Sequence, residues 1–333
     1  QVLFLTTANY LPQVPEPLRD RMEVIRLSGY VDQEKFAIAR QFLVPKQLRL
    51  NGLDADRVEW DTDTIPAIVH QYTREAGVRE LERRLSRISR KLARRRAEAR
   101  DLGTKPDGEA SPVKSRVRAA DLKDLLGVPP YDPSLLNLDH KVGVATGLAY
   151  TSVGGEVLEI EVAAIGGRGK VQLTGTLGDV MKESASAALS YARARATTLG
   201  IDRDFHRSRD LHVHIPSGGT PKDGPSAGIA IATAIISALT GIPVRGDVAM
   251  TGEITLRGRV LPIGGLKEKA VAAHRNTVRH VLIPHQNWRD VEELPEEVRA
   301  GITFHPVRTM DEVLALALVH TDFATDVPAI APH

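Results

Sequence analysis

The sequence predicts an α/β protein in two parts, an all-α subdomain followed by a domain of mixed α/β topology. Three observations support this fold class. Apolar residues at three- and four-residue spacing indicate a long helix in the first third of the chain. Short strand-like runs separated by glycine turns begin at about residue 134. A proline-rich stretch, residues 129–133, separates the two patterns and is typical of a stiff linker between domains.

Composition narrows the function classes. The 333-residue chain is 42% hydrophobic and 26% charged, as expected of a globular protein. Its formal net charge of +2 is too small to imply nucleic acid or an acidic membrane as an obligate partner. The absence of cysteine excludes disulfides, thiolate metal sites and cysteine-protease chemistry. No apolar run approaches the roughly 20 residues that a bilayer span requires, so we expect a cytoplasmic protein without a membrane partner.

Residues 1–30 contain an apolar run, residues 2–5, followed by a polar turn and a loop with several prolines. The run predicts a buried strand that the chain enters midway, and the first residue is not Met. Such a piece has no core of its own, so we expect the chain to be part of a longer protein.

Residues 31–128 have the pattern of a helical subdomain. Asp32 is a candidate cap for a helix that continues through Phe36 and Phe42. A second, longer helix has an apolar stripe formed by Leu81, Leu85, Ile88 and Leu92. The outer face of the longer helix is basic, with Arg83, Arg84, Arg87, Arg90, Lys91, Arg94, Arg95 and Arg96. This face is either a solvated helix surface, which we favour, or a weak DNA-binding patch.

Residues 129–320 alternate between strands and helices. Strands are expected at residues 142–150, 157–164, 170–174, 211–215, 248–251, 259–263 and 280–283. A helix is predicted for residues 179–199, and a second one, apolar on almost every side, for residues 228–239. The second helix should be buried at the centre of the domain and end at Gly241.

A serine hydroxyl precedes the buried helix. Ser226 lies in its first turn, where free backbone N–H groups and the positive end of the helix dipole favour developing negative charge. The turn could therefore stabilise the oxyanion of an acyl-transfer reaction. From position alone, we favour the simpler explanation that Ser226 is an ordinary helix cap.

A serine nucleophile needs a base, and two kinds of candidate are present. His212 and His214 alternate on one predicted strand, so both should lie on the same face. Lys269 falls on the small-residue face of a helix, whereas Lys267 points further from that face. Burial would lower the pKa of Lys269 from about 10.4 toward the range of a general base. The helical wheel alone slightly favours the alternative, in which Lys269 extends to solvent.

The chain closely resembles the proteolytic domain of bacterial Lon proteases from about residue 141 to about residue 318. The resemblance rests on PKDGPSAG at residues 221–228 and on MTGEITLRGRVLPIGGLKEKAVAAHR at residues 250–275. It implies that Ser226 is the nucleophile and Lys269 the base of a Ser–Lys dyad. It also implies that Thr251 bonds to the lysine and that Asp223 supports the site. Residues 129–320 would then form a Lon-type proteolytic domain, with 321–333 as a C-terminal tail.

Earlier segments resemble parts of an AAA+ ATPase. LTTAN, residues 5–9, is similar to a sensor-1 strand, with Asn9 facing the γ-phosphate. LRDRMEVIRL resembles an arginine-finger loop, with Arg21 reaching a neighbouring subunit, and YTREAGVRELER resembles a sensor-2 helix, with Arg79 on phosphate. The resemblance therefore implies that residues 1–30 belong to the end of an ATPase core and that residues 31–128 are its helical lid.

One departure from the family limits what this chain does. It contains no GxxxxGK followed by Ser or Thr, so the phosphate-cradling loop is absent. We therefore expect ATP and Mg²⁺ to serve the intact parent, while the peptidase site needs neither cofactor nor metal. The resemblance implies a ring of six subunits that degrades unfolded polypeptides through an acyl-enzyme intermediate. The alternatives are a catalytically silent module that forms rings or binds peptides, and a DNA-binding accessory fragment.

Overall fold

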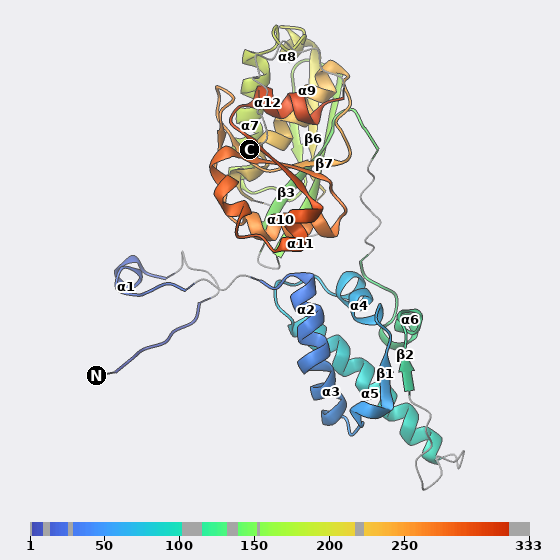
Figure 1. Cartoon of the computed structure of the whole chain (residues 1–333). Helices are drawn as coiled ribbons and strands as arrows, with labels where there is room; N and C mark the ends of the chain where they lie inside the picture. The colour runs from blue at the N-terminus through green and yellow to red at the C-terminus, as the bar shows by residue number, and fades with distance from the viewer. Residues whose placement is uncertain are drawn as a thin grey trace.

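The computed structural model describes residues 2–8, 14–25, 29–101, 115–131, 139–151, 154–216 and 223–319. It contains a helical domain and an α/β domain, which lie one above the other in Figure 1. The predicted tail, residues 321–333, lies outside the described residues.

The helical domain has its own hydrophobic core. Its elements are α2 (Asp32–Ile38), the π-helical turn η2 (Ala39–Leu43), α3 (Val44–Leu50), η3 (Ala55–Arg57), β1 (Val58–Trp60), α4 (Thr64–Tyr72), α5 (Arg79–Asp101), β2 (Ser115–Val117), η4 (Ala119–Asp121) and α6 (Leu122–Leu126). Leu81, Leu85 and Ile88 of α5 are buried in this core, which confirms the predicted apolar stripe. The domain also contains a parallel pair of three-residue strands, β1 and β2, that the helical pattern did not predict. These strands are too short for a period-two pattern to stand out, and each adds one buried valine to the core.

Two expectations for the first 32 residues were wrong. Residues 2–5 are exposed and form no strand, because none of the described strands pairs with them. A short helix, α1 (Glu16–Arg19), follows them. Asp32 does not cap α2, since the cap position is Val31 and the Asp32 carboxylate instead bonds to Arg275 and His70.

The α/β domain is built on short strands and helices. Its elements are β3 (Val144–Thr151), β4 (Gly154–Gly166), β5 (Val171–Thr174), α7 (Asp179–Ala194), α8 (Phe205–Ser208), β6 (Arg209–His214), η5 (Pro225–Ala227), α9 (Gly228–Thr240), β7 (Val248–Met250), β8 (Glu253–Ile254), β9 (Val260–Leu261), α10 (Leu266–Arg275), β10 (His280–Pro284), η6 (His285–Val291), α11 (Glu296–Gly301), β11 (Thr303–Val307) and α12 (Met310–Ala317).

Seven of these strands form one mixed sheet in the order β11-β10-β7-β3-β4-β6-β5. The strands β11, β10, β7 and β3 run parallel, β4 is antiparallel to both of its neighbours, and β5 is parallel to β6. The predicted strands are all present, whereas β8 and the edge strand β11 were missed. Pro306 in β11 removes an amide donor, which is tolerated at a sheet edge but weakens the sequence signal.

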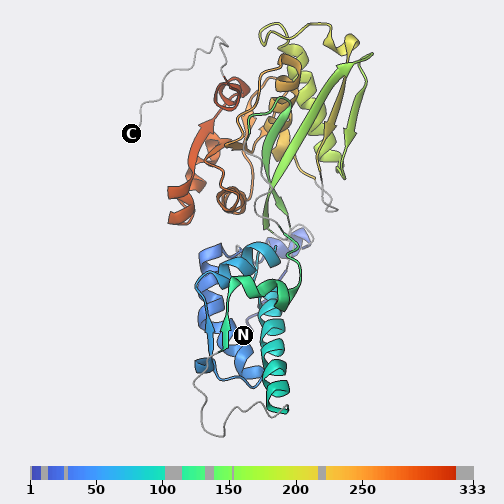
Figure 2. The ribbon, with the colours of Figure 1, turned by 90° about the vertical axis from the view of Figure 1, so that its right-hand side faces the viewer.

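Helices cover both faces of the sheet (Figure 2). Met250 of β7 packs in the core formed with α7, α9 and α12, while its neighbour Ala249 packs in the core formed with α10 and α11. Alternate strand residues point to opposite faces, so α9 and α10 lie on opposite sides of the sheet. As predicted, α9 is buried and is followed by Gly241 in the left-handed conformation, at φ 76°. None of the described helices is both long and apolar enough to cross a bilayer.

Candidate active site

Ser226 lies in the 3-10 turn η5, directly before the buried helix α9. Its side chain is half-buried. The turn is fixed from two sides: the Gly252 amide donates to the Ser226 carbonyl oxygen at 2.8 Å, and the Ser184 hydroxyl donates to the Pro225 carbonyl oxygen at 3.3 Å. The sequence predicted free amides in this turn, but the Gly228 and Ile229 amides already donate to carbonyl oxygens.

Lys269 lies on α10 and is only 2% exposed, so it does not extend to solvent, the alternative that the helical wheel alone slightly favoured. Lys267, two residues earlier, is half-buried. Burial lowers the pKa of Lys269 to about 8, although the neighbouring Glu268 carboxylate acts in the opposite direction. A fraction of this amine is therefore neutral and basic at neutral pH.

Thr251 connects the lysine to the serine turn. It follows β7 directly and is fully buried. Its hydroxyl accepts a hydrogen bond from Lys269 Nζ at 3.1 Å and donates one to the Ser226 carbonyl oxygen at 3.3 Å. Within the described part of the chain, no hydrogen bond joins Lys269 Nζ to the Ser226 hydroxyl. The three residues thus meet at the end of β7, although their helices lie on opposite faces of the sheet.

Asp223 lies in the loop just before the serine turn and joins it to helix α7. One of its oxygens, Oδ1, accepts hydrogen bonds from the Met181 amide and the Gly224 amide, both at 3.0 Å. Met181 lies in the first turn of α7, so Asp223 caps that helix from a distant part of the chain. A side chain at Gly178 would collide with Asp223, since a Cβ atom there would lie 2.2 Å from Cγ.

His212 and His214 lie on one face of β6, as their alternation predicted. Both rings contact the Thr174 hydroxyl of the neighbouring strand, His212 through Nε2 at 2.7 Å and His214 through Nδ1 at 2.8 Å. No hydrogen bond in the described structure joins either ring to Ser226. The geometry therefore favours Lys269 over either histidine as the partner of the serine.

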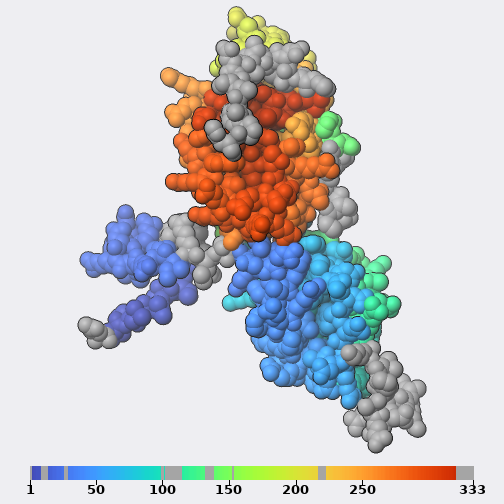
Figure 3. Space-filling view, viewed as in Figure 1, coloured from blue at the N-terminus to red at the C-terminus, as the bar shows by residue number. Residues whose placement is uncertain are grey.

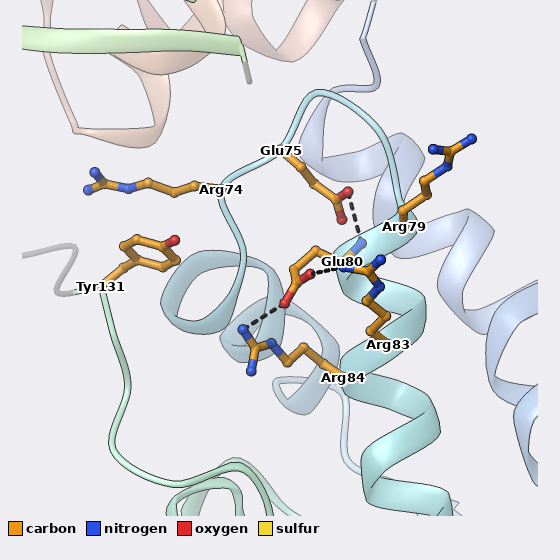
Figure 4. Close-up of a pocket in the computed structure, with 7 residues that line it drawn as sticks. All are labelled: Arg74, Glu75, Arg79, Glu80, Arg83, Arg84 and Tyr131. Atoms are coloured by element: carbon orange, nitrogen blue, oxygen red, sulfur yellow. Dashed lines mark hydrogen bonds and ion pairs between the residues drawn. The ribbon is translucent and has the colours of Figure 1, made fainter. Parts of the chain in front are cut away.

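Arg79 begins α5 and lines a cationic cavity of about 450 Å³ in the helical domain (Figure 4). The cavity is lined by Arg74, Glu75, Arg79, Glu80, Arg83, Arg84 and Tyr131. Glu80 pairs with Arg83 and Arg84, and the Arg74 guanidinium lies 4.7 Å from the centre of the Tyr131 ring. Among the described residues, Arg79 has no ion-pair partner. Its charge is therefore available to an anion.

Of the other residues in the predicted nucleotide site, Asn9 lies outside the described residues, and Arg21 is exposed in the turn after α1. The basic face of α5 is partly neutralised by acidic neighbours, including Glu80, Glu98 and Asp124. These pairs are typical of a solvated helix surface, and DNA binding there stays a prediction. Among the described residues, no group of three or more His, Asp or Glu side chains is placed to hold a metal ion.

Two supporting residues escaped the sequence analysis. Ser184 is one of several small residues on α7, and nothing in its spacing indicates contact with a turn 41 residues away. Gly178 precedes a predicted helix, where glycine has an ordinary explanation as a cap. Only the fold reveals that it makes room for Asp223.

Two family models of known proteins match parts of the chain. A family model described as Lon protease (S16) C-terminal proteolytic domain matches residues 116–320. A second one, described as Lon protease AAA+ ATPase lid domain, matches residues 49–105.

Individual relatives are similar over almost the whole chain. The chain is 49% identical over 328 residues to a Lon protease of Solibacter usitatus (strain Ellin6076), covering 98% of this chain and 40% of that protein. Its identity to a Lon protease of Erwinia amylovora is 51% over 329 residues, 99% of this chain and 41% of that protein. For a Lon protease of Escherichia coli (strain K12) it is 51% over 317 residues, 95% of this chain and 39% of that protein. The chain thus spans about 40% of the length of these relatives.

Proposed function

The chain belongs to the Lon protease (S16) family, and we propose that it is a serine endopeptidase in which Ser226 is the nucleophile and Lys269 the general base. The observation that carries the proposal is the hydrogen bonding of Thr251, which holds the buried Lys269 next to the turn of Ser226. Burial also lowers the pKa of Lys269 to about 8.

The hydrogen bonds around Thr251 leave the lone pair of a neutral Lys269 free. Thr251 donates its only hydroxyl proton to the Ser226 carbonyl oxygen and can therefore only accept from Lys269. A neutral amine that donates one N–H to Thr251 keeps its lone pair for the proton of the Ser226 hydroxyl. To complete the dyad, the Ser226 hydroxyl would have to come within hydrogen-bond distance of Lys269 Nζ when substrate binds.

The proposed reaction has two stages. Lys269 takes the proton from the Ser226 hydroxyl while its oxygen attacks the scissile carbonyl, and the ammonium then protonates the leaving amine. The resulting ester is hydrolysed by water that the neutral lysine activates. The Gly224, Gly228 and Ile229 amides are already bonded, and Pro225 has no N–H. The Ser226 and Ala227 amides of this turn are therefore the candidates to stabilise the oxyanion.

The helical domain fits the role of a nucleotide-sensing lid in a longer parent. A cavity with four arginines in its lining suits the charge of a polyphosphate, and Arg79 would hold it there. ATP with Mg²⁺ would supply phosphoryl-transfer chemistry in the longer protein. Asn9 and Arg21 would also contact the bound nucleotide there. We expect the parent to be a hexamer acting on unfolded polypeptides. The present chain, which has no phosphate loop, should cleave peptides without ATP stimulation.

Labelling with a peptidyl boronate, together with cleavage of a fluorogenic peptide, tests the proposal. We expect the boronate to modify Ser226, and Ser226→Ala to abolish turnover while the fold is retained. Lys269→Arg should be nearly as damaging, because a guanidinium group stays protonated near neutral pH and therefore cannot act as a base. Lys267→Arg is the matched control and should be tolerated. Near-normal turnover by Ser226→Ala would refute the assignment, as would greater damage by Lys267→Arg than by Lys269→Arg. Absence of turnover by the unsubstituted chain would favour a silent binding module.

A further inference from the structure

The first turn of α2 docks on the α/β domain beside the helix that carries Lys269. Figure 3 shows the two domains in contact there, where α2 meets the region of α10 and α11. Asp32 accepts two hydrogen bonds from Arg275, the last residue of α10, one of them from Nε at 3.0 Å. The next residue, Gln33, donates to Glu297 in α11 at 3.3 Å.

The Asp32–Arg275 pair differs from an ordinary surface ion pair. The side chains are only 18% and 24% exposed, and the geometry is bidentate. His70 Nε2 lies 3.0 Å from Asp32 Oδ2 and orients the carboxylate further. Burial raises the pKa of Asp32, but the hydrogen bonds from His70 and Arg275 more than offset it and hold the pKa well below its usual range. Such a pair fixes the relative position of the groups that it joins.

Arg275 and Lys269 are six residues apart on α10, which is less than two helical turns. The other end of α10 is held by β4, where Gly155 lies so close that a Cβ atom would be 1.9 Å from the Glu268 carbonyl oxygen. A helix clamped at one end by backbone contact and at the other by an ion pair has little freedom to rotate. The orientation of Lys269 therefore depends on both clamps.

On the opposite side, α2 is tied to the helix that begins at Arg79. Lys35, one turn after Asp32, is 2% exposed and donates from Nζ to the Glu75 carbonyl oxygen. The Glu75 carboxylate accepts hydrogen bonds from the Glu80 and Leu81 amides, at 2.9 and 2.8 Å. The start of α5 and α2 are thus joined through Glu75, next to the cationic cavity.

We propose that Asp32 and Arg275 are positioning residues that fix α10 across the domain boundary, so that the seating of Lys269 against Thr251 depends on the helical domain. The proposal rests on the proposed function for its effect on catalysis, whereas its structural part, the clamping of α10, stands independently. A change at the Arg79 cavity that moved α2 would reach Lys269 through this ion pair.

Two variants, Asp32→Asn and Arg275→Gln, test the role of the pair in the full chain. Peptide turnover is measured from about pH 6 to about pH 10, and exchange of the α10 amides is followed by hydrogen–deuterium exchange. Loosening α10 admits water to Lys269 and weakens the burial that lowers its pKa. We expect the midpoint of the pH profile to rise by about 0.5–1 unit, turnover at about pH 7 to fall about 3–10-fold, and the α10 amides to exchange faster.

The double variant and two controls make the test specific. Because the two residues form one contact, peptide turnover by the double variant should be no lower than that of the more impaired single variant. Asp311→Asn breaks another Asp–Arg pair, inside the α/β domain, in which Arg195 Nη2 donates to both carboxylate oxygens. This variant should leave the midpoint and α10 exchange unchanged. Asp32→Glu keeps the charge and should retain most of the parent profile, which separates loss of the pair from failure to fold.

Parental α10 exchange and a parental midpoint in both single variants would overturn the inference, as would additive effects in the double variant. If the parent chain itself shows no turnover, the proposed function fails, and the exchange measurement alone decides whether the pair clamps α10. Faster exchange in Asp32→Asn with parental exchange in Asp311→Asn would then support the clamp.

Discussion

Replacing Lys269 by methionine should abolish peptide cleavage and at the same time stabilise the fold. Methionine has a similar length and suits an apolar site, whereas Lys269 carries an ionisable group on a side chain that is buried. Burial lowers the pKa of Lys269 from 10.5 to about 8. This difference of about 2.5 pH units corresponds to about 3 kcal/mol, at about 1.4 kcal/mol per unit.

Loss of the hydrogen bond to Thr251 reduces this gain by about 1 kcal/mol. We therefore expect Lys269→Met to raise the free energy of unfolding at pH 7 by about 2 kcal/mol, which corresponds to about 4–8 °C in Tm for a domain of this size. The gain should depend on pH in a defined way. Between about pH 8 and about pH 10.5 the unfolded lysine binds a proton that the folded one has released, so the stability of the parent rises with pH. The advantage of the variant is full below about pH 8 and declines as the pH rises. At about pH 10.5 the charge contribution is gone, and loss of the Thr251 hydrogen bond leaves the variant less stable by about 1 kcal/mol.

Urea unfolding of both proteins at a series of pH values, followed by circular dichroism, measures the difference directly. A variant that is less stable than the parent at pH 7 would contradict the reasoning. So would a gain in stability that persists unchanged to high pH, because it would come from packing and not from the buried charge.

Three further predictions follow from the same geometry. Thr251→Val should lower peptide turnover about 10–100-fold, because it leaves the lysine without its hydrogen-bond partner, and steady-state kinetics on a folded variant would check this. Gly155→Ala should destabilise the α/β domain by about 1–3 kcal/mol in urea unfolding, since the new methyl group would collide with the Glu268 carbonyl oxygen. Asp223→Ala should cost about 1 kcal/mol through loss of the cap on α7 and lower turnover by loosening the serine turn, whereas parental stability and turnover would argue against this role.

Local patterns in the sequence were sufficient for much of the fold. The apolar stripe of Leu81, Leu85 and Ile88 fixed the buried face of α5, and the continuous apolar run before Gly241 fixed α9 as a central helix. These predictions succeed because burial of a helix face depends on residues a few positions apart, which the sequence displays directly. The same reasoning placed Lys269 on the small-residue face of its helix, but only the structure shows that its side chain is buried there.

The apolar run at residues 2–5 shows where local patterns fail. An apolar run predicts a buried strand. A strand also needs a partner for its backbone hydrogen bonds, and none of the described strands pairs with this run. Asp32 is a similar case, since its residue type predicted a helix cap while its actual partners, Arg275 and His70, are 243 and 38 residues away. A carboxylate bonds to whichever donors the fold brings near it.

For the candidate site, the sequence by itself determined the chemical groups: a serine in a turn before a buried helix, and a lysine on a small-residue helix face. Only the tertiary structure decided that these groups meet. Helices α9 and α10 lie on opposite faces of the sheet. Thr251, at the end of β7, joins the serine turn before α9 to Lys269 of α10 through its two hydrogen bonds. The lowered pKa of Lys269 has the same origin, because desolvation is a property of the packed domain and not of any segment.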